Sequence, residues 1–487
     1  MKKISFILLT LFLVLPFTSC KKFLEVVPKT QMPQDVLFST QNGFKDALAG
    51  VYVQMKDNNA YGLAMTQTTI EQLVSSWDVT SGNTDQALGL FNYTQAGAES
   101  ALSEIFKQEY RIIAGVNAIL GQIDAKKEVF TTPGMYELVK SEALAMRAYC
   151  HLDLLRLFGP IPSDPSNGNM LAYVTTLSKT PTTRIPFEAY KTALLKDLAD
   201  AEALAKDVDP IVQYTIAQLR SPSVSSGFNP DDTYLAFRYL RLNYYAIKAL
   251  QARAYLWFGD KQKAYENAKV VIDAKNQDGS AKFRLGTAAD MSGANNDFTL
   301  VNEHLFGLYD YNMFTKYGTY YSSGTLKKGS AVTTVNTTLY GNTGTDIRET
   351  YLWELLTLAN QSKVYVIKKY KPLESPGATT DFKQIPMLRL SEMYLIMAEV
   401  APLAEAQTYW NTFKTARNVT TSTLPADDMQ RALEVLKETR KEFYAEGQAF
   451  YAYKRLNVPR TSIVFAPTAA VVNYLPPLPP VEITTLN

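Results

Sequence analysis

The segment 234–275 constrains the fold of this chain more than any other, because small and aromatic residues recur in it at a fixed spacing. Four of its residues match the spacing of a tetratricopeptide unit: Ala252, Tyr255, Ala264 and Ala268. Gly259 lies where the turn of such a unit is expected. Small alanines let two antiparallel helices approach closely, and the tyrosine fills the space beside them. The pattern therefore predicts a packed helix pair.

Apolar residues at helical spacing predict long helices in other parts of the chain. We expect a first helix that begins near Ser39. Further helices should span about 98–122, 134–158, 186–206, 389–400, 404–417 and 427–447. Gly159 and Pro160 should end the helix over 134–158, because neither residue continues a helix well. The chain is expected to be mostly α-helical.

Residues 278–381 differ from this pattern, since they are rich in Gly, Ser, Thr, Asn and Tyr. We expect long loops here with a few short strands, among them 304–309 and 363–367. Loops of this length in a globular chain usually carry function. The Pro-rich last forty residues are expected to pack as an extended tail.

The first residues have the order of an export signal. Two lysines precede an apolar run over 4–14, and Cys20 follows a short stretch of small residues. We predict a signal peptide over 1–19, a lipid on Cys20 and an extended tether over 20–33. An ordinary signal peptide followed by a chance cysteine is the alternative, and Phe17, three residues before the cysteine, favours it.

Composition narrows the remaining possibilities. With Cys20 lipidated, only Cys150 is left, so no internal disulfide forms and stability must come from packing. A chain of 487 residues with 46% hydrophobic residues has enough apolar surface for this. A net charge of +2 argues against nucleic-acid binding.

The sequence carries no recognisable catalytic motif. His151 and His304 are the two histidines, and their positions do not place two metal ligands on one helix face. A Gly-x-Ser-x-Gly elbow and a phosphate-binding Gly-rich loop are also missing from the sequence. We therefore predict no enzyme activity, no metal and no cofactor. A carboxylate pair for glycoside hydrolysis stays open, because its spacing is a tertiary property.

Two charged sets have helical spacing, which favours a structural role in ion pairs within and between helices. They are Arg389, Glu392 and Glu399, and Arg440, Glu442 and Glu446.

Several segments, in order, resemble the SusD/RagB family of Bacteroidetes lipoproteins. They are CKKFLE at 20–25, EALAMRAY at 142–149, FGPIP at 158–162, RLSEMYLIMAE at 389–399 with Asn411 and Arg417-Asn418, and RKEFYAEG at 440–447 with YKR at 453–455. The last two groups are the most specific. Together the segments span almost the whole mature chain.

The resemblance implies one SusD-like domain over 34–487. Its body would hold four tetratricopeptide-like helix pairs, with the loop-rich insertion at about 278–381. The resemblance further implies a lipid-anchored protein on the outer membrane, facing the cell exterior. Its partner would be a SusC-like TonB-dependent transporter, to which it delivers a captured nutrient.

Aromatic residues in loops are the candidates for ligand binding, because their faces stack on sugar rings or peptide side chains. The candidate residues lie in two loop segments: Trp77, Asp78 and Asn83 in the first, and Tyr309, Tyr311, Tyr317, Tyr320 and Tyr321 in the second. An aromatic residue in a long loop is also often the group that pins the loop to the body, so packing is the alternative.

We expect the ligand to be an oligosaccharide. Peptide capture of the RagB type is the alternative on the same scaffold. A tetratricopeptide scaffold that binds protein partners, and a glycan-cleaving enzyme, are rivals of other classes.

Overall fold

The computed structural model describes residues 33–293, 296–329, 333–371, 383–480 and 482. The predicted signal peptide, the lipidation site Cys20 and the predicted tether as far as residue 32 lie outside the described residues. No helix among the described residues is long and apolar enough to cross a membrane.

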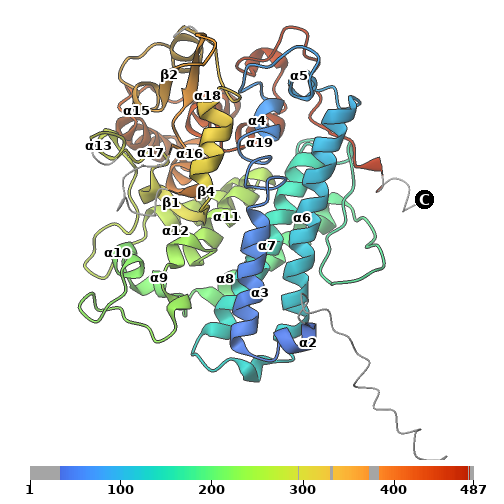
Figure 1. The fold of residues 1–487 in the computed structure, drawn as a ribbon. Coiled ribbons are helices and arrows are strands. Elements are labelled where there is room, and N and C mark those ends of the chain that lie inside the picture. Colours follow the sequence, from blue (N-terminus) through green and yellow to red (C-terminus); the bar gives the residue numbers. More distant parts are fainter. Residues whose placement is uncertain (1–32, 294–295, 330–332, 372–382, 481, 483–487) are drawn as a thin grey trace, which may run out of the picture.

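Eight helices form the body, and each packs on the next one along the chain (Figure 1). They are α3 (Gln41–Met55), α6 (Ala96–Ile123), α7 (Met135–Phe158), α8 (Phe187–Ala205), α11 (Tyr244–Trp257), α12 (Lys261–Ile272), α16 (Leu390–Val400) and α17 (Leu403–Ala416). Taken in order they make four helix pairs. The predicted mostly helical body of four pairs is confirmed.

Further elements surround this body. The other α-helices are α2 (Gln34–Leu37), α4 (Thr69–Leu73), α5 (Thr84–Gly89), α9 (Pro210–Gln213), α10 (Ile216–Arg220), α13 (Ala288–Met291), α14 (Met313–Tyr317), α15 (Ile347–Tyr351), α18 (Asp428–Glu442) and α19 (Ala449–Arg455). The 3-10 and π turns are η3 (Lys127–Val129), η4 (Thr233–Leu235), η5 (Arg238–Leu240), η6 (Val301–Glu303), η7 (Gly318–Ser322), η8 (Thr333–Tyr340) and η10 (Arg460–Ser462).

The helix pair α11–α12 has the predicted packing. Ala252, Ala264 and Ala268 are fully buried, so the two helices meet at their small residues. Tyr255 is partly buried against the same core. Gly259 adopts φ +79° in the turn between them, a conformation that glycine takes at little cost.

Helix α7 is buried on every side from Ser141 to Phe158, not on one apolar stripe. Its buried charges are all paired across to other elements or along the helix. Arg147, for example, forms a two-point pair with Asp197 of α8, with both N–O distances 2.7 Å. Pairing is what makes a central helix with charged residues possible, because an unpaired buried charge is costly.

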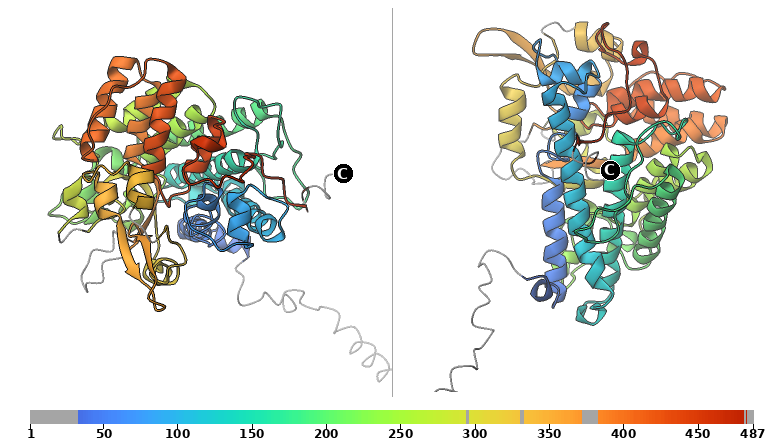
Figure 2. Two further views of the ribbon diagram at one scale, coloured as in Figure 1. Left: turned by 90° about the horizontal axis from the view of Figure 1, so that it is seen from above. Right: turned by 90° about the vertical axis from the view of Figure 1, so that its right-hand side faces the viewer.

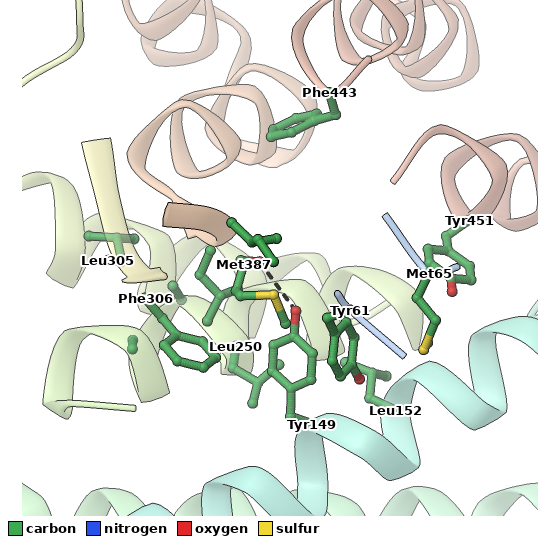
Figure 3. Close-up of a cluster of buried hydrophobic side chains, with 14 of the residues drawn as sticks. Tyr61, Met65, Tyr149, Leu152, Leu250, Leu305, Phe306, Met387, Phe443 and Tyr451 are labelled. Carbon is green, nitrogen blue, oxygen red and sulfur yellow. Dashed lines mark hydrogen bonds between the residues drawn. The ribbon is translucent and has the colours of Figure 1, made fainter. Parts of the chain in front are cut away.

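Tyr149 of α7 joins the helical body to the rest of the core (Figure 3). Its ring makes edge-to-face contacts with Tyr61, at 5.4 Å, and with Phe306, at 6.1 Å between centroids. Its hydroxyl donates to the backbone oxygen of Met387 at 3.3 Å. The core is therefore continuous between α7 and the strands that follow.

The loop-rich segment contains the two predicted strands, which are β1 (His304–Tyr309) and β3 (Lys363–Ile367). β3 pairs with β2 (Trp353–Thr357) in an antiparallel hairpin that projects from one end of the molecule (Figure 2). β1 pairs antiparallel with β4 (Gln384–Arg389), a strand that the sequence analysis did not identify because it runs directly into α16.

The predicted extended tail over the last forty residues is confirmed only in part, because residues 449–455 form α19 and the extended backbone is found at 470–479. Tyr93 donates through its hydroxyl to the backbone oxygen of Asn473 at 2.6 Å, and the Asn169 amide donates to that of Pro476 at 3.0 Å. Tyr474 is buried. The tail is thus held by side chains from the N-terminal half.

The prediction that the helix over 427–447 continues to Gly447 is wrong, since α18 ends at Glu442. Ala445 and Gly447 have φ values of +63° and +71°, so the chain turns sharply after the helix. The backbone N–H of Gly447 donates to the buried Glu71 carboxylate at 2.8 Å. We call residues 443–447 the corner. Bonds to distant residues hold it, and helical spacing does not reveal them.

A buried ion cluster ties the loop-rich segment to the body. It consists of Arg348, Lys369, Arg389, Lys414 and Arg417 with Glu303, Asp346, Glu438, Glu442 and Glu446. Glu442 lies at its centre and accepts from Arg389 at 2.8 Å and from Arg417 at 2.7 Å. Its other oxygen accepts from Arg348 at 3.2 Å.

The predicted structural role of the charged family motifs is confirmed, although their partners lie on other elements and not within one helix. Arg389 pairs with Glu446 at 2.9 Å. Glu392, from the same motif, pairs with Arg253 at 2.7 Å.

The remaining charged residues of the two motifs also have their partners on other elements. Glu399 pairs with Arg455 at 2.7 Å, and Arg440 lies 3.4 Å from the Glu71 carboxylate. These residues position helices.

Electrostatics sets the ionisation state of the cluster. The neighbouring Arg417 and Arg389 hold the pKa of Glu442 well below its usual value, against the opposing effect of burial. Arg348 and the lysines beside it similarly lower the pKa of Glu438. Both carboxylates are therefore ionised in the folded protein near neutral pH.

We expect Gly447→Ala to lower the free energy of unfolding by about 2–3 kcal/mol. An added Cβ would lie 1.9 Å from the backbone oxygen of Met65, in a conformation already unfavourable for alanine. Gly121→Ala is the matched control, because Gly121 lies in α6 with no atom within 4 Å of the new Cβ. The control should be neutral or slightly stabilising in urea unfolding. Equal stability of the two variants would contradict the account of the corner.

We expect Glu442→Gln to cost about 3–5 kcal/mol, because it leaves buried guanidinium groups without their counter-charge. Glu434→Gln, at the exposed pair with Lys437 on the same helix, should cost less than about 1 kcal/mol. Urea unfolding at pH 7 compares the two variants.

The same variant should change the pH dependence of stability. Since the pKa values of Glu438 and Glu442 are lower in the folded than in the unfolded state, their contribution is present above the unfolded value of about 4.3. This stabilising contribution is lost as the pH falls through the pKa values that the two carboxylates have in the folded state. The wild-type stability should thus fall below pH 4–5 more steeply than that of Glu442→Gln, and parallel curves would exclude this role.

Candidate functional site

The two predicted aromatic loops meet in the structure, but they meet in the core. The Trp77 side chain is 3% exposed, and its ring makes edge contacts with Tyr321 at 6.0 Å and with Tyr444 of the corner at 5.3 Å. Its indole N–H donates to the backbone oxygen of Gln67 at 2.7 Å. No ring face is left for a ligand, so the predicted binding role of Trp77 is wrong. Packing explains it.

Tyr321 and Tyr317 belong to the same buried group. Tyr321 is 1% exposed and donates its hydroxyl proton to the Gln67 side chain at 2.9 Å. Tyr317 is also buried, stacks on Tyr321 at 5.2 Å and donates to Glu354 of β2 at 3.1 Å. Burial raises the pKa of both hydroxyls, so they stay protonated donors. The predicted contact of Tyr317 and Tyr321 with a ligand is therefore also wrong, because both rings are buried in the core.

Asp78 and Asn83 have structural partners. Asp78 pairs with Lys328 at 2.9 Å and also accepts from the backbone N–H of Gly329, so it fixes the loop after Tyr321. Asn83 is the N-cap of α5, where its side-chain oxygen accepts from the N–H of Gln86 at 2.8 Å. Both remain partly exposed, and their ligand role stays a prediction.

The other tyrosines keep accessible surface. Tyr311 is 74% exposed, and the Lys383 ammonium lies 5.2 Å from the centre of its ring. Tyr309 and Tyr320 are half-buried on either side of α14. Phe314 of α14, which was not among the predicted site residues, is 55% exposed. We call Tyr309, Tyr311, Phe314 and Tyr320 the α14 aromatic set.

The α14 aromatic set is held on a fixed support. The Lys316 ammonium pairs with Asp310 at 2.8 Å and donates to the backbone oxygen of Gly62 at 3.1 Å. Lys56 of the segment after α3 donates to the backbone oxygen of Tyr309 at 3.0 Å. These contacts on both sides of α14 fix the position of the helix that presents the aromatic rings.

The two histidines have structural environments. His151 is fully buried between the Tyr190 hydroxyl, at 2.9 Å, and the backbone N–H of Val174, at 3.1 Å. Burial lowers the pKa of His151 to about 3, so its ring stays neutral. His304 lies between the Gln384 side chain and a backbone oxygen. In the described ranges no group of His, Cys, Asp and Glu side chains is arranged to hold a metal ion.

Comparison with known proteins agrees with the family motifs. A family model described as SusD-like, starch-binding and associating with the outer membrane matches residues 22–215. The SusD-like protein P25 of Formosa agariphila is 24% identical over 166 residues, which cover 33% of this chain and 31% of that protein. The SusD-like protein P2 of the same organism is 26% identical over 273 residues, which cover 56% of this chain and 46% of that protein.

The chain thus spans about a third and about half of the length of these two curated relatives. Its fold is similar over a larger share to the crystal structure of a SusD superfamily protein from Bacteroides thetaiotaomicron. That similarity has a TM-score of 0.65 at 20% identity and covers 92% of this chain and 98% of the other. A family described by binding agrees with the expectation that the chain is not an enzyme. These likenesses support the resemblance of the chain to the SusD-like family that its own motifs indicate.

Proposed function

We propose that the protein is a cell-surface lipoprotein that captures an oligosaccharide and delivers it to a SusC-like TonB-dependent transporter. The observation that carries this proposal is the match to a family described as starch-binding and associated with the outer membrane. The α14 aromatic set supports it, because exposed rings on a fixed support suit stacking on sugar faces. Lipidation at Cys20, the outward orientation and the one-domain organisation belong to the same proposal.

The position of the aromatic set also bears on ligand class. The ring of Tyr311 is accessible beside the polar side chain of Asn312, which is exposed as well. A flat apolar face with an amide next to it fits the ring and the hydroxyl groups of a sugar. Peptide capture would use the same surface through side-chain contacts, and the binding test separates the two.

We expect the double variant Tyr311→Ala with Phe314→Ala to bind a starch oligosaccharide such as maltoheptaose about tenfold more weakly, because each stacked ring is worth about 0.5–1.5 kcal/mol. The melting temperature should not change, since both side chains are exposed. Isothermal titration calorimetry measures the affinity. Met429→Ala, an exposed apolar position on α18, is the control and should bind normally.

Trp77→Phe separates packing from binding. It should lower the melting temperature through loss of the bond to Gln67 and leave the affinity unchanged. Full affinity of the Tyr311 and Phe314 double variant would reject the α14 aromatic set. Binding of tryptic peptides but of no glycan on a panel would favour the peptide alternative.

A separate test addresses the anchor and orientation. In intact cells, external protease should digest the wild-type protein, and Cys20→Ala should leave the membrane fraction and lose palmitate labelling. Protection of the wild type from protease would place it on the periplasmic side of the membrane.

A further inference from the structure

Glu109 of α6 is a fully buried glutamate without a counter-charge. In the described part of the chain no cation pairs with it, and its Oε1 atom has no hydrogen-bond partner. An unpaired buried charge is costly, so Glu109 differs from the other glutamates that have no exposed surface. Each of those lies within ion-pair distance of an arginine: Glu71 of Arg440, Glu142 of Arg238 and Glu303 of Arg417.

The hydroxyl of Tyr61, in the segment after α3, lies between Glu109 and a second buried carboxylate. It is 3.1 Å from Oε2 of Glu109 and 3.0 Å from Oδ2 of Asp153 on α7. A phenol has one proton to donate, and an ionised carboxylate can only accept. With both carboxylates ionised, one of the two contacts would bring two oxygens together without a proton between them. Both contacts are hydrogen bonds only if one carboxyl group is protonated.

The charges around these residues decide which carboxyl group keeps the proton. Arg156 forms an ion pair with Asp153 and donates to its Oδ1 atom at 3.0 Å, which favours the ionised form of Asp153. Burial and the charge of Asp153 raise the pKa of Glu109 well above its usual value. No cation is found among the titratable groups that face Glu109, which are Tyr61, Cys150 and Asp153 of α7, Tyr190 of α8 and Tyr451 of α19.

From this geometry we propose that Glu109 is a neutral acid that donates its proton to the Tyr61 hydroxyl, which in turn donates to Asp153. The proton thereby holds the segment after α3, residues 56–68, against α6. Gly62, the residue after Tyr61, accepts from Lys316 of α14, so the held segment also supports α14. When Glu109 loses its proton, two anions face one hydroxyl and the segment is released. The fold thus contains a pH-sensitive latch, whatever ligand the protein binds.

The latch makes stability depend on pH in one direction. Because the pKa of Glu109 is raised in the folded state, the folded chain keeps a proton that the unfolded chain loses above a pH of about 4.3. The stabilisation by this proton is complete below that pH. It falls as the pH rises toward the folded pKa of Glu109.

Urea unfolding of the full mature chain at several pH values between about 5 and 8 tests the inference. The equilibrium constant of unfolding should rise about tenfold per pH unit in the wild type relative to Glu109→Gln, because unfolding releases one proton. Glu109→Gln keeps a donor toward Tyr61 and has no charge to bury, so it should be the more stable of the two at about pH 8. Glu104→Gln, at the exposed pair with Lys107 on the same helix, is the matched control and should follow the wild type. Parallel curves for the wild type and Glu109→Gln would overturn the inference.

Infrared spectroscopy of the wild-type chain locates the proton without any variant. At neutral pH the C=O stretching band of a protonated carboxyl group should shift when glutamate is labelled with ¹³C. A band that shifts only when aspartate is labelled would show that Glu109 is ionised and would contradict the proposal.

Hydrogen exchange tests whether the proton holds the segment after α3. The backbone N–H groups of Tyr61 and Gly62 donate to the backbone oxygens of Met55 and Asp57, both at 3.1 Å, so they are protected while the segment is held. After correction for the chemical exchange rate, this protection should fall with rising pH in the wild type and stay constant in Glu109→Gln. The same pH dependence of protection in both chains would mean that the proton is no latch.

Discussion

The buried ion cluster around Glu442 is the interaction on which the rest of the structure depends. Buried charges cost solvation free energy, so such a cluster is tolerated only when every member is paired. Its members come from β4, α17, α18 and the loop-rich segment, and each accepts or donates with correct geometry only when all four are in place. A segment of long loops, which has little secondary structure of its own, is thereby bound to the helical body at one defined position.

The corner at 443–447 extends that constraint to the aromatic loops. Its backbone is held by the Lys369 ammonium, which donates to the backbone oxygens of Glu442 and Tyr444 at 3.0 and 2.9 Å. From this fixed corner the ring of Phe443 lies 4.8 Å from the Arg389 guanidinium, and Tyr444 touches the ring of Trp77 under the aromatic loops. One short stretch of chain therefore links the ion cluster to the support of the loops.

The sequence predicted those features whose contacts join residues that are close together in the chain. The alanines of α11 and α12 predicted their pairing, because both helices and their turn lie within about forty residues. The end of α18 could not be read, since the Gly447 N–H bonds to Glu71, 376 residues away. Trp77 illustrates the same limit. Its partners Tyr321 and Tyr444 are distant in the chain, and a loop aromatic that stacks on a ligand has the same sequence signature as one that packs.

The burial of Trp77 changes where the proposed ligand contacts can lie. Rings that pin the loops to the core have no free face, so they shape the surface without contacting a sugar. Accessible aromatic area is left at Tyr311, just before α14, and at Phe314 on that short helix, which Lys316 fastens to the segment after α3. In a family whose members share the scaffold, exposed residues of this kind can vary without loss of stability, because they pair with nothing in the core. The proposed ligand contacts on this face can therefore change independently of the fold.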